Sequence, residues 1–311
     1  MSFTTDELGF RNRYQPLSAA AIVFGDSFAQ SGNDGETLAA QLSQVAGCDI
    51  YNAAGPDEIF RRPDVPLLRS LKTPISLRGG VVIMERLERV FFEKPKPEPA
   101  SIGAALAQGF FEWGPKQIPG VWRLGRIVEM GKEMAGSSPL EVLSDRGFRV
   151  LRDDRILPNS YADNVVKATL RNGDWILFYP DEMATYERQW PVDVSYWTRI
   201  APDLAKLGLT LVVVLVPNKY TVYYRMLADP RPVGVEPGEL LDRVEAKLHA
   251  AGIAVVNLTR VLREAAVKDL ERHEYVYWRD DTHWNRQGVA VAAREIEGRR
   301  HACRSSGMAL S

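Results

Sequence analysis

A serine and a histidine with acidic neighbours lie near opposite ends of this 311-residue chain. Ser27 follows an apolar run at 19–24, within the segment GDSF at 25–28. A serine at the turn between a strand and a helix has an exposed hydroxyl and nearby backbone N–H groups that can hold an oxyanion. His283 lies in the segment DDTHWN at 280–285. These residue types predict a catalytic triad, which is defined by geometry rather than by order along the chain.

Ser27 is the predicted nucleophile and His283 the predicted general base. A serine hydroxyl is barely ionised at neutral pH, so it needs a base within hydrogen-bond reach. The chain has four histidines, and His283 is the one in a loop dense with acidic and aromatic residues. Asp281, or alternatively Asp280, is expected to orient the imidazole and stabilise its charged form. A metal site made of these three residues is not predicted, because no second cluster of ligands accompanies them.

Donors for an oxyanion are expected at the ends of neighbouring strands, in addition to the Ser27 N–H. Gly55 would let the backbone approach a substrate closely, or it is an ordinary turn glycine. Asn52 offers a side-chain amide, or it caps its strand. Arg89 is a third candidate for substrate binding, and its alternative role is an ion pair with a neighbouring carboxylate.

The elements that must position these residues alternate between strands and helices. Short, uniformly apolar runs predict strands, and amphipathic stretches predict helices between several of them. Strands are expected at 20–24, 49–52, 80–84, 175–179, 209–216 and 253–257, and helices at 36–46, 194–207, 237–251, 260–271 and from Asn285 onward. This alternation predicts an α/β fold with a mainly parallel sheet between helical layers. The site is then expected at the carboxyl ends of the strands.

The alternation is interrupted after the proline-rich segment KPKPEP at 94–99. Residues 95–159 are predicted to be an inserted small helical segment, either a subdomain or lid, or a hairpin packed on the sheet edge. Residues 1–94 and 160–300 form the predicted catalytic domain. The segment 301–311 is expected to be a disordered tail.

Composition excludes several classes of protein. The net charge of −1, without long basic clusters, argues against nucleic-acid binding. The two cysteines cannot form a disulfide framework, and Cys48 is expected to be a small buried residue. No phosphate-binding or dinucleotide fingerprint occurs, so no cofactor is predicted. A polar N-terminus without an apolar signal region, and the lack of a long apolar run, predict a cytoplasmic protein.

Several segments resemble the SGNH (GDSL-like) hydrolase superfamily. GDSF at 25–28 resembles its nucleophile block, and DTH at 281–283 resembles its last block. The segments DTHWNRQG at 281–288, VPNKYTVY at 216–223 and ERLER at 85–89 are most similar to one branch, the polysaccharide O-acetyltransferases typified by the alginate acetylation proteins. In that branch the histidine motif precedes the serine motif, so the chain resembles a circular permutation of it.

The resemblance implies a flavodoxin-like, three-layer α/β/α domain that performs O-acyl chemistry on a carbohydrate or polysaccharide. An acetyl donor would acylate Ser27, and a sugar hydroxyl would then accept the acetyl group. An esterase that hydrolyses the same ester is the alternative, because it uses the same residues. A non-catalytic carbohydrate-binding scaffold subunit is the alternative from a different class. The branch also implies membrane acyltransferase or biosynthetic-complex partners and a periplasmic location, in contrast to the cytoplasmic prediction.

Overall fold

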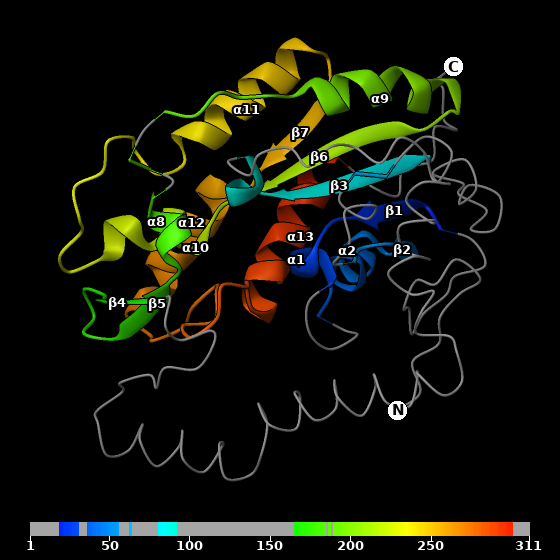
Figure 1. Ribbon diagram of the computed structural model, residues 1–311. Coiled ribbons are helices and arrows are strands. Elements are labelled where there is room, and N and C mark those ends of the chain that lie inside the picture. Colours follow the sequence, from blue (N-terminus) through cyan, green and yellow to red (C-terminus); the bar gives the residue numbers. More distant parts are fainter. Residues whose placement is uncertain are drawn as a thin grey trace, which may run out of the picture. The chain divides into compact units, whose positions relative to one another are not determined.

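The computed structural model describes residues 19–30, 36–55, 62–63, 80–91, 165–184, 186–187 and 189–300. The predicted insertion at 95–159 and the predicted tail at 301–311 lie outside these described residues. All the described helices and strands belong to one unit of the chain (Figure 1).

A five-stranded sheet forms the centre of the described part (Figure 1). Its strands are β1 (Ala21–Phe24), β2 (Ile50–Asn52), β3 (Val81–Leu87), β6 (Thr210–Val216) and β7 (Ala254–Asn257). They lie in the order β2-β1-β3-β6-β7, and every neighbouring pair is parallel. The order reverses direction at β1, and such a switch point is where α/β sheets bind ligands, beyond the carboxyl ends of the strands.

Helices cover both faces of this sheet. The helices are α1 (Ser27–Gln30), α2 (Leu38–Ala46), α8 (Pro180–Ala184), α9 (Ser195–Lys206), α10 (Lys219–Tyr223), α11 (Glu239–Ala250), α12 (Thr259–Leu270) and α13 (Arg286–Arg300), with 3-10 turns η1 (Glu88–Phe91) and η4 (Tyr224–Met226). Helices α9 and α11 lie on one face, whereas α2 and α13 pack together on the other (Figure 1). The predicted three-layer α/β/α fold is therefore confirmed.

Local sequence signals explain where two of these helices begin. Thr37 caps α2, because its hydroxyl accepts a hydrogen bond from the Ala40 N–H at 3.2 Å. Asn285 caps α13 in the same way, accepting from the Gly288 N–H at 3.1 Å. The predicted start of the last helix at Asn285 is thus confirmed. This start fixes the position of the loop at 278–285 that precedes α13, called the histidine loop below.

The strand predicted at 175–179 does not join the parallel sheet. It forms β5 (Trp175–Phe178), which pairs antiparallel with β4 (Val166–Thr169) in a separate two-stranded sheet. The turn between them explains this pairing. Asn172 accepts a hydrogen bond from the Asp174 N–H at 3.1 Å, and Gly173 has a φ of 87°, so the chain reverses within a few residues.

Cys48 also differs from its prediction as a buried apolar residue. It is only partly buried against the core, and it is disulfide-bonded. The sequence contains one other cysteine, Cys303, which lies outside the described residues. Among the described helices, none is both long enough and apolar enough to cross a membrane.

Candidate active site

Ser27 lies where the chain leaves β1 and is the first residue of helix α1. The turn before it is held by the buried residue Glu85 of β3, whose Oε2 accepts a hydrogen bond from the Asp26 N–H at 3.1 Å. Asp26 in turn accepts from the Phe28 N–H at 2.9 Å, which caps the short helix. A Cβ at Gly25 would lie 2.8 Å from the Ala29 Cβ and 2.9 Å from the Glu85 Cβ, so this position requires glycine.

Burial raises the pKa of Glu85 well above its ordinary value, and the negative charge of Asp26 raises it further. Both effects favour the uncharged form of the Glu85 carboxyl beneath the serine turn.

His283 connects Ser27 to Asp281 through both of its ring nitrogens. Its Nε2 lies 2.8 Å from Ser27 Oγ, and its Nδ1 lies 2.6 Å from Asp281 Oδ1. The same carboxylate oxygen accepts the His283 backbone N–H at 2.9 Å. If Nδ1 carries the proton, Nε2 is free to accept the serine proton, which is the arrangement that general-base catalysis needs.

The charge of Asp281 is stabilised at this position. Hydrogen bonding to His283 lowers the pKa of Asp281 to about 2, and Lys219 contributes a smaller favourable charge interaction. Asp281 is therefore ionised at neutral pH, when it can orient the imidazole and stabilise its protonated form.

Two contacts attach the histidine loop to the serine turn. The indole Nε1–H of Trp284 donates to the carbonyl of Phe28 at 2.7 Å. The Phe28 ring packs against the His283 ring, with centroids 4.7 Å apart. Phe28 and Trp284 are buried and directly adjoin Ser27 and His283 in sequence. They therefore fix the separation of the Ser27 and His283 side chains.

The other candidates of the sequence analysis lie nearby, but in different contacts. Asp280 is exposed, and the carboxylate that faces His283 is that of Asp281. The Gly55 N–H donates to the Gly25 carbonyl at 3.1 Å. Asn52 Oδ1 accepts from the Ala54 N–H at 3.1 Å. Both residues thus support the turn beside Ser27, and their roles toward an oxyanion remain predictions.

Arg89 makes the contacts of its alternative role, an ion pair. Its Nη1 lies 3.3 Å from Glu182 Oε1 and 2.7 Å from the hydroxyl of Thr282. The guanidinium also lies over the Phe28 ring, 5.4 Å from its centroid. Arg89 therefore contacts residues on both sides of the site: Phe28, next to Ser27, and Thr282, next to His283.

The sequence did not predict two buried charged residues that contact the loop around His283. Glu182, in α8, is buried and accepts a hydrogen bond from the Thr282 hydroxyl at 2.7 Å. Lys219, the first residue of α10, is buried beneath the histidine loop. The segment at 216–223 contained Lys219, but nothing in it indicated a contact with residues about sixty positions away. No motif pointed to Glu182.

The α/β fold and the hydrogen bonds that join Ser27, His283 and Asp281 define a class of protein. This class is the α/β proteins with the Ser-His-Asp geometry of serine hydrolases. Residues 172–302 match the family model described as SGNH hydrolase-like domain, acetyltransferase AlgX. This match confirms the resemblance to the SGNH superfamily and to its acetyltransferase branch over that part of the chain. It includes Asp281 and His283, whereas Ser27 lies outside it.

A curated relative agrees with this assignment. The chain is 28% identical over 116 residues to "Probable alginate O-acetylase AlgJ" of Pseudomonas syringae pv. tomato. The matched region is 37% of this chain and 28% of that protein, so the chain spans little more than a quarter of the relative's length.

Two solved structures show weaker similarity. One is described as a lipolytic protein of the G-D-S-L family from Desulfitobacterium hafniense DCB-2, with a TM-score of 0.38 and 10% identity, covering 89% of this chain and 97% of that one. The other has a TM-score of 0.42 and 11% identity, covering 94% and 100%. Because both TM-scores are below 0.5, the fold assignment depends on the sheet and helices described above.

Proposed function

We propose that this protein transfers an acetyl group to a carbohydrate hydroxyl through an acetyl-Ser27 intermediate. The observation that carries the proposal is the chain of hydrogen bonds from Ser27 Oγ to His283 and Asp281, at 2.8 and 2.6 Å. The match of 172–302 to an acetyltransferase family model supports acetyl chemistry rather than another use of the same residues.

In each step of the proposed reaction a proton moves to or from His283 while a bond to the acetyl carbon forms or breaks. Ser27 gives its proton to His283 Nε2 as Oγ attacks the acetyl carbonyl, and an oxyanion forms. His283 returns the proton to the leaving group of the donor, and acetyl-Ser27 remains. A sugar hydroxyl then gives its proton to His283 and attacks the acetyl carbon. The bond between the acetyl group and Ser27 Oγ breaks, and His283 returns the proton to Oγ, which regenerates Ser27 and releases the O-acetylated sugar. Asp281 stabilises the imidazolium in both halves.

One further assignment, the oxyanion donor, and two alternative functions belong to this proposal. The Ser27 N–H, at the start of α1, is the proposed first oxyanion donor. The same catalytic residues serve an esterase, in which water replaces the sugar hydroxyl. A non-catalytic scaffold would keep the geometry without forming an acyl-enzyme.

The disulfide bond of Cys48 supports a proposal for the compartment. Disulfides persist in oxidising compartments and are rare in the cytosol, and Cys48 is disulfide-bonded. We therefore propose an oxidising compartment such as the periplasm, in place of the cytoplasmic location predicted from the sequence. An acyl donor and a polysaccharide are the proposed partners there.

The experiment that tests this function compares acceptors. The protein is incubated with p-nitrophenyl acetate, alone and with neutral or uronate oligosaccharides, and both p-nitrophenol and acetylated sugar are measured. A transferase yields acetylated sugar at the expense of free acetate. Release of acetate alone, with every acceptor, would assign the protein as an esterase. No release above that of Ser27→Ala would favour the scaffold.

A further inference from the structure

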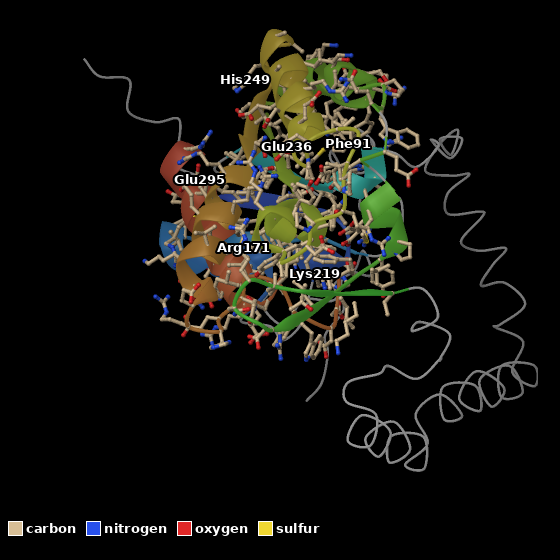
Figure 2. All side chains as sticks on the ribbon, turned by 90° about the vertical axis from the view of Figure 1, so that its left-hand side faces the viewer. Phe91, Arg171, Lys219, Glu236, His249 and Glu295 are labelled. Carbon is tan, nitrogen blue, oxygen red and sulfur yellow. The ribbon has the colours of Figure 1, made fainter. Side chains whose placement is uncertain are left out.

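Lys219 is a buried cation whose hydrogen bonds all go to the histidine loop. Its side chain is 1% exposed, and it lies at the point where β6 leads into α10. The ammonium donates to three carbonyl groups, those of Trp278 at 3.2 Å, Arg279 at 3.3 Å and Asp281 at 2.7 Å. In Figure 2 it is labelled beside the β4–β5 ribbon, and its Nζ lies 5.6 Å from the ring centroid of Phe178 in β5.

This arrangement uses the full donor capacity of the side chain. A lysine ammonium has three N–H donors and no acceptor, and the loop provides three acceptors. The loop carbonyls must therefore converge on one point, which fixes the bend of the chain just before His283. Since its donors are engaged, Lys219 has no N–H left for a substrate, so it acts on the reaction through the loop.

A second set of contacts holds the same loop at Thr282, the residue that follows Asp281. The Thr282 hydroxyl donates to Glu182 Oε1 at 2.7 Å and accepts from Arg89 Nη1 at 2.7 Å. Burial raises the pKa of Glu182, and the positive charges of Lys219 and Arg89 oppose this rise. The buried carboxylate thus compensates the two cations that surround the loop.

We propose that Lys219 is a positioning residue: through the carbonyls of Trp278, Arg279 and Asp281 it holds the Asp281 carboxylate in line with His283 Nδ1. The inference rests on the proposed function, because the catalytic value of that alignment depends on His283 acting as the base for Ser27. Loss of Lys219 releases the loop carbonyls and lets the imidazole leave the geometry in which Nε2 faces Ser27.

The test substitutes Lys219→Met, which is unbranched and one heavy atom shorter than lysine and removes all three donors. Lys247→Met is the matched control, because Lys247 also donates to a backbone carbonyl, that of Val192 at 2.7 Å, but on an exposed surface of α11. Lys219→Met is expected to lower kcat for p-nitrophenyl acetate by about 10- to 100-fold with KM nearly unchanged, whereas Lys247→Met keeps both values.

A readout that does not depend on activity is the amide exchange of the loop. The Trp278 N–H donates to the His283 carbonyl at 3.1 Å, and the His283 N–H donates to Asp281 Oδ1 at 2.9 Å. Both amides are expected to exchange faster in Lys219→Met, while amides of α11 keep their wild-type rates. If Lys219→Met does not fold, Lys219→Gln replaces it in the test. Its shorter side chain has two N–H donors for three carbonyls, so a smaller loss of kcat and a smaller rise in exchange are expected.

The two proposals fail in different ways. Wild-type protein without Ser27-dependent activity would overturn the proposed function, while the exchange rates of Trp278 and His283 would still report on Lys219. Unchanged exchange and unchanged kcat in Lys219→Met, or in Lys219→Gln if that variant is the one that folds, would overturn the positioning role.

Discussion

Asp281→Asn tests how the imidazole is oriented. Asp281 accepts both the Nδ1–H of His283, at 2.6 Å, and the His283 backbone N–H, at 2.9 Å. An asparagine that presents its NH₂ group to Nδ1 favours the tautomer in which Nε2 carries the proton. In that tautomer Nε2 cannot accept the proton of Ser27, so the base is lost although every side chain stays in place.

The magnitude follows from the exposure of the carboxylate. Loss of a buried orienting aspartate lowers kcat by about 10⁴-fold. The Asp281 side chain is 53% exposed, so water can replace part of its interaction with the imidazole. We therefore expect a fall in kcat of about 10³-fold, which corresponds to about 4 kcal/mol of transition-state stabilisation.

The assay is the steady-state hydrolysis of p-nitrophenyl acetate, and Asp280→Asn is the matched control. Asp280 is the adjacent, exposed aspartate, so its substitution removes the same charge from the loop without touching His283. Asp280→Asn is expected to retain kcat within about twofold, because a solvent-exposed charge contributes little. Equal losses in the two variants would refute the reasoning, because a general charge effect would then explain both.

Other perturbations give expected outcomes for stability. Burial raises the pKa of Glu88 from 4.5 to about 7; the folded state therefore binds more protons than the unfolded state between these values, and stability falls as pH rises through this window. The fall is about 3 kcal/mol in total, and denaturant unfolding of Glu88→Gln should lack it; a pH dependence equal to that of wild type would contradict the assignment. Gly288→Ala places a Cβ 2.1 Å from the carbonyl oxygen of Val276 and is expected to lower the free energy of unfolding by about 1–3 kcal/mol or more; an unchanged melting temperature would contradict this. Cys48→Ser, or reduction of the wild type, is expected to lower the melting temperature, because the disulfide restricts the unfolded chain; equal melting temperatures with and without reductant would show that the bond contributes nothing.

The parts of the fold that the sequence predicted are those determined by local chemistry. The run 20–24 predicted a buried strand because a parallel sheet needs apolar residues on both faces, and β1 (Ala21–Phe24) is that strand. Asn285 predicted the start of α13 because its side chain satisfies an N–H only a few residues away. Ser27 follows β1 and His283 precedes α13, so these two elements bring the two side chains together.

The features of the fold and site that the sequence did not predict depend on contacts between residues distant in sequence. The run 175–179 was as apolar as the core strands, but the turn at Asn172 and Gly173 gave it an antiparallel neighbour instead. Lys219 reaches carbonyls about sixty residues further along the chain, and backbone carbonyls carry no residue-type signal. Glu182 is recognisable only once Thr282 lies beside it.

The central claim, that Ser27 is the nucleophile, is tested most directly by the site of acetylation. Wild-type protein and Ser27→Ala are quenched with acid shortly after mixing with p-nitrophenyl acetate, and their peptides are analysed by mass spectrometry. We expect one added acetyl group on the wild-type peptide that contains Ser27. In Ser27→Ala both this acetyl group and turnover should be absent. Turnover that persists in Ser27→Ala, or an acetyl group that accumulates on another residue with wild-type kinetics, would contradict the account.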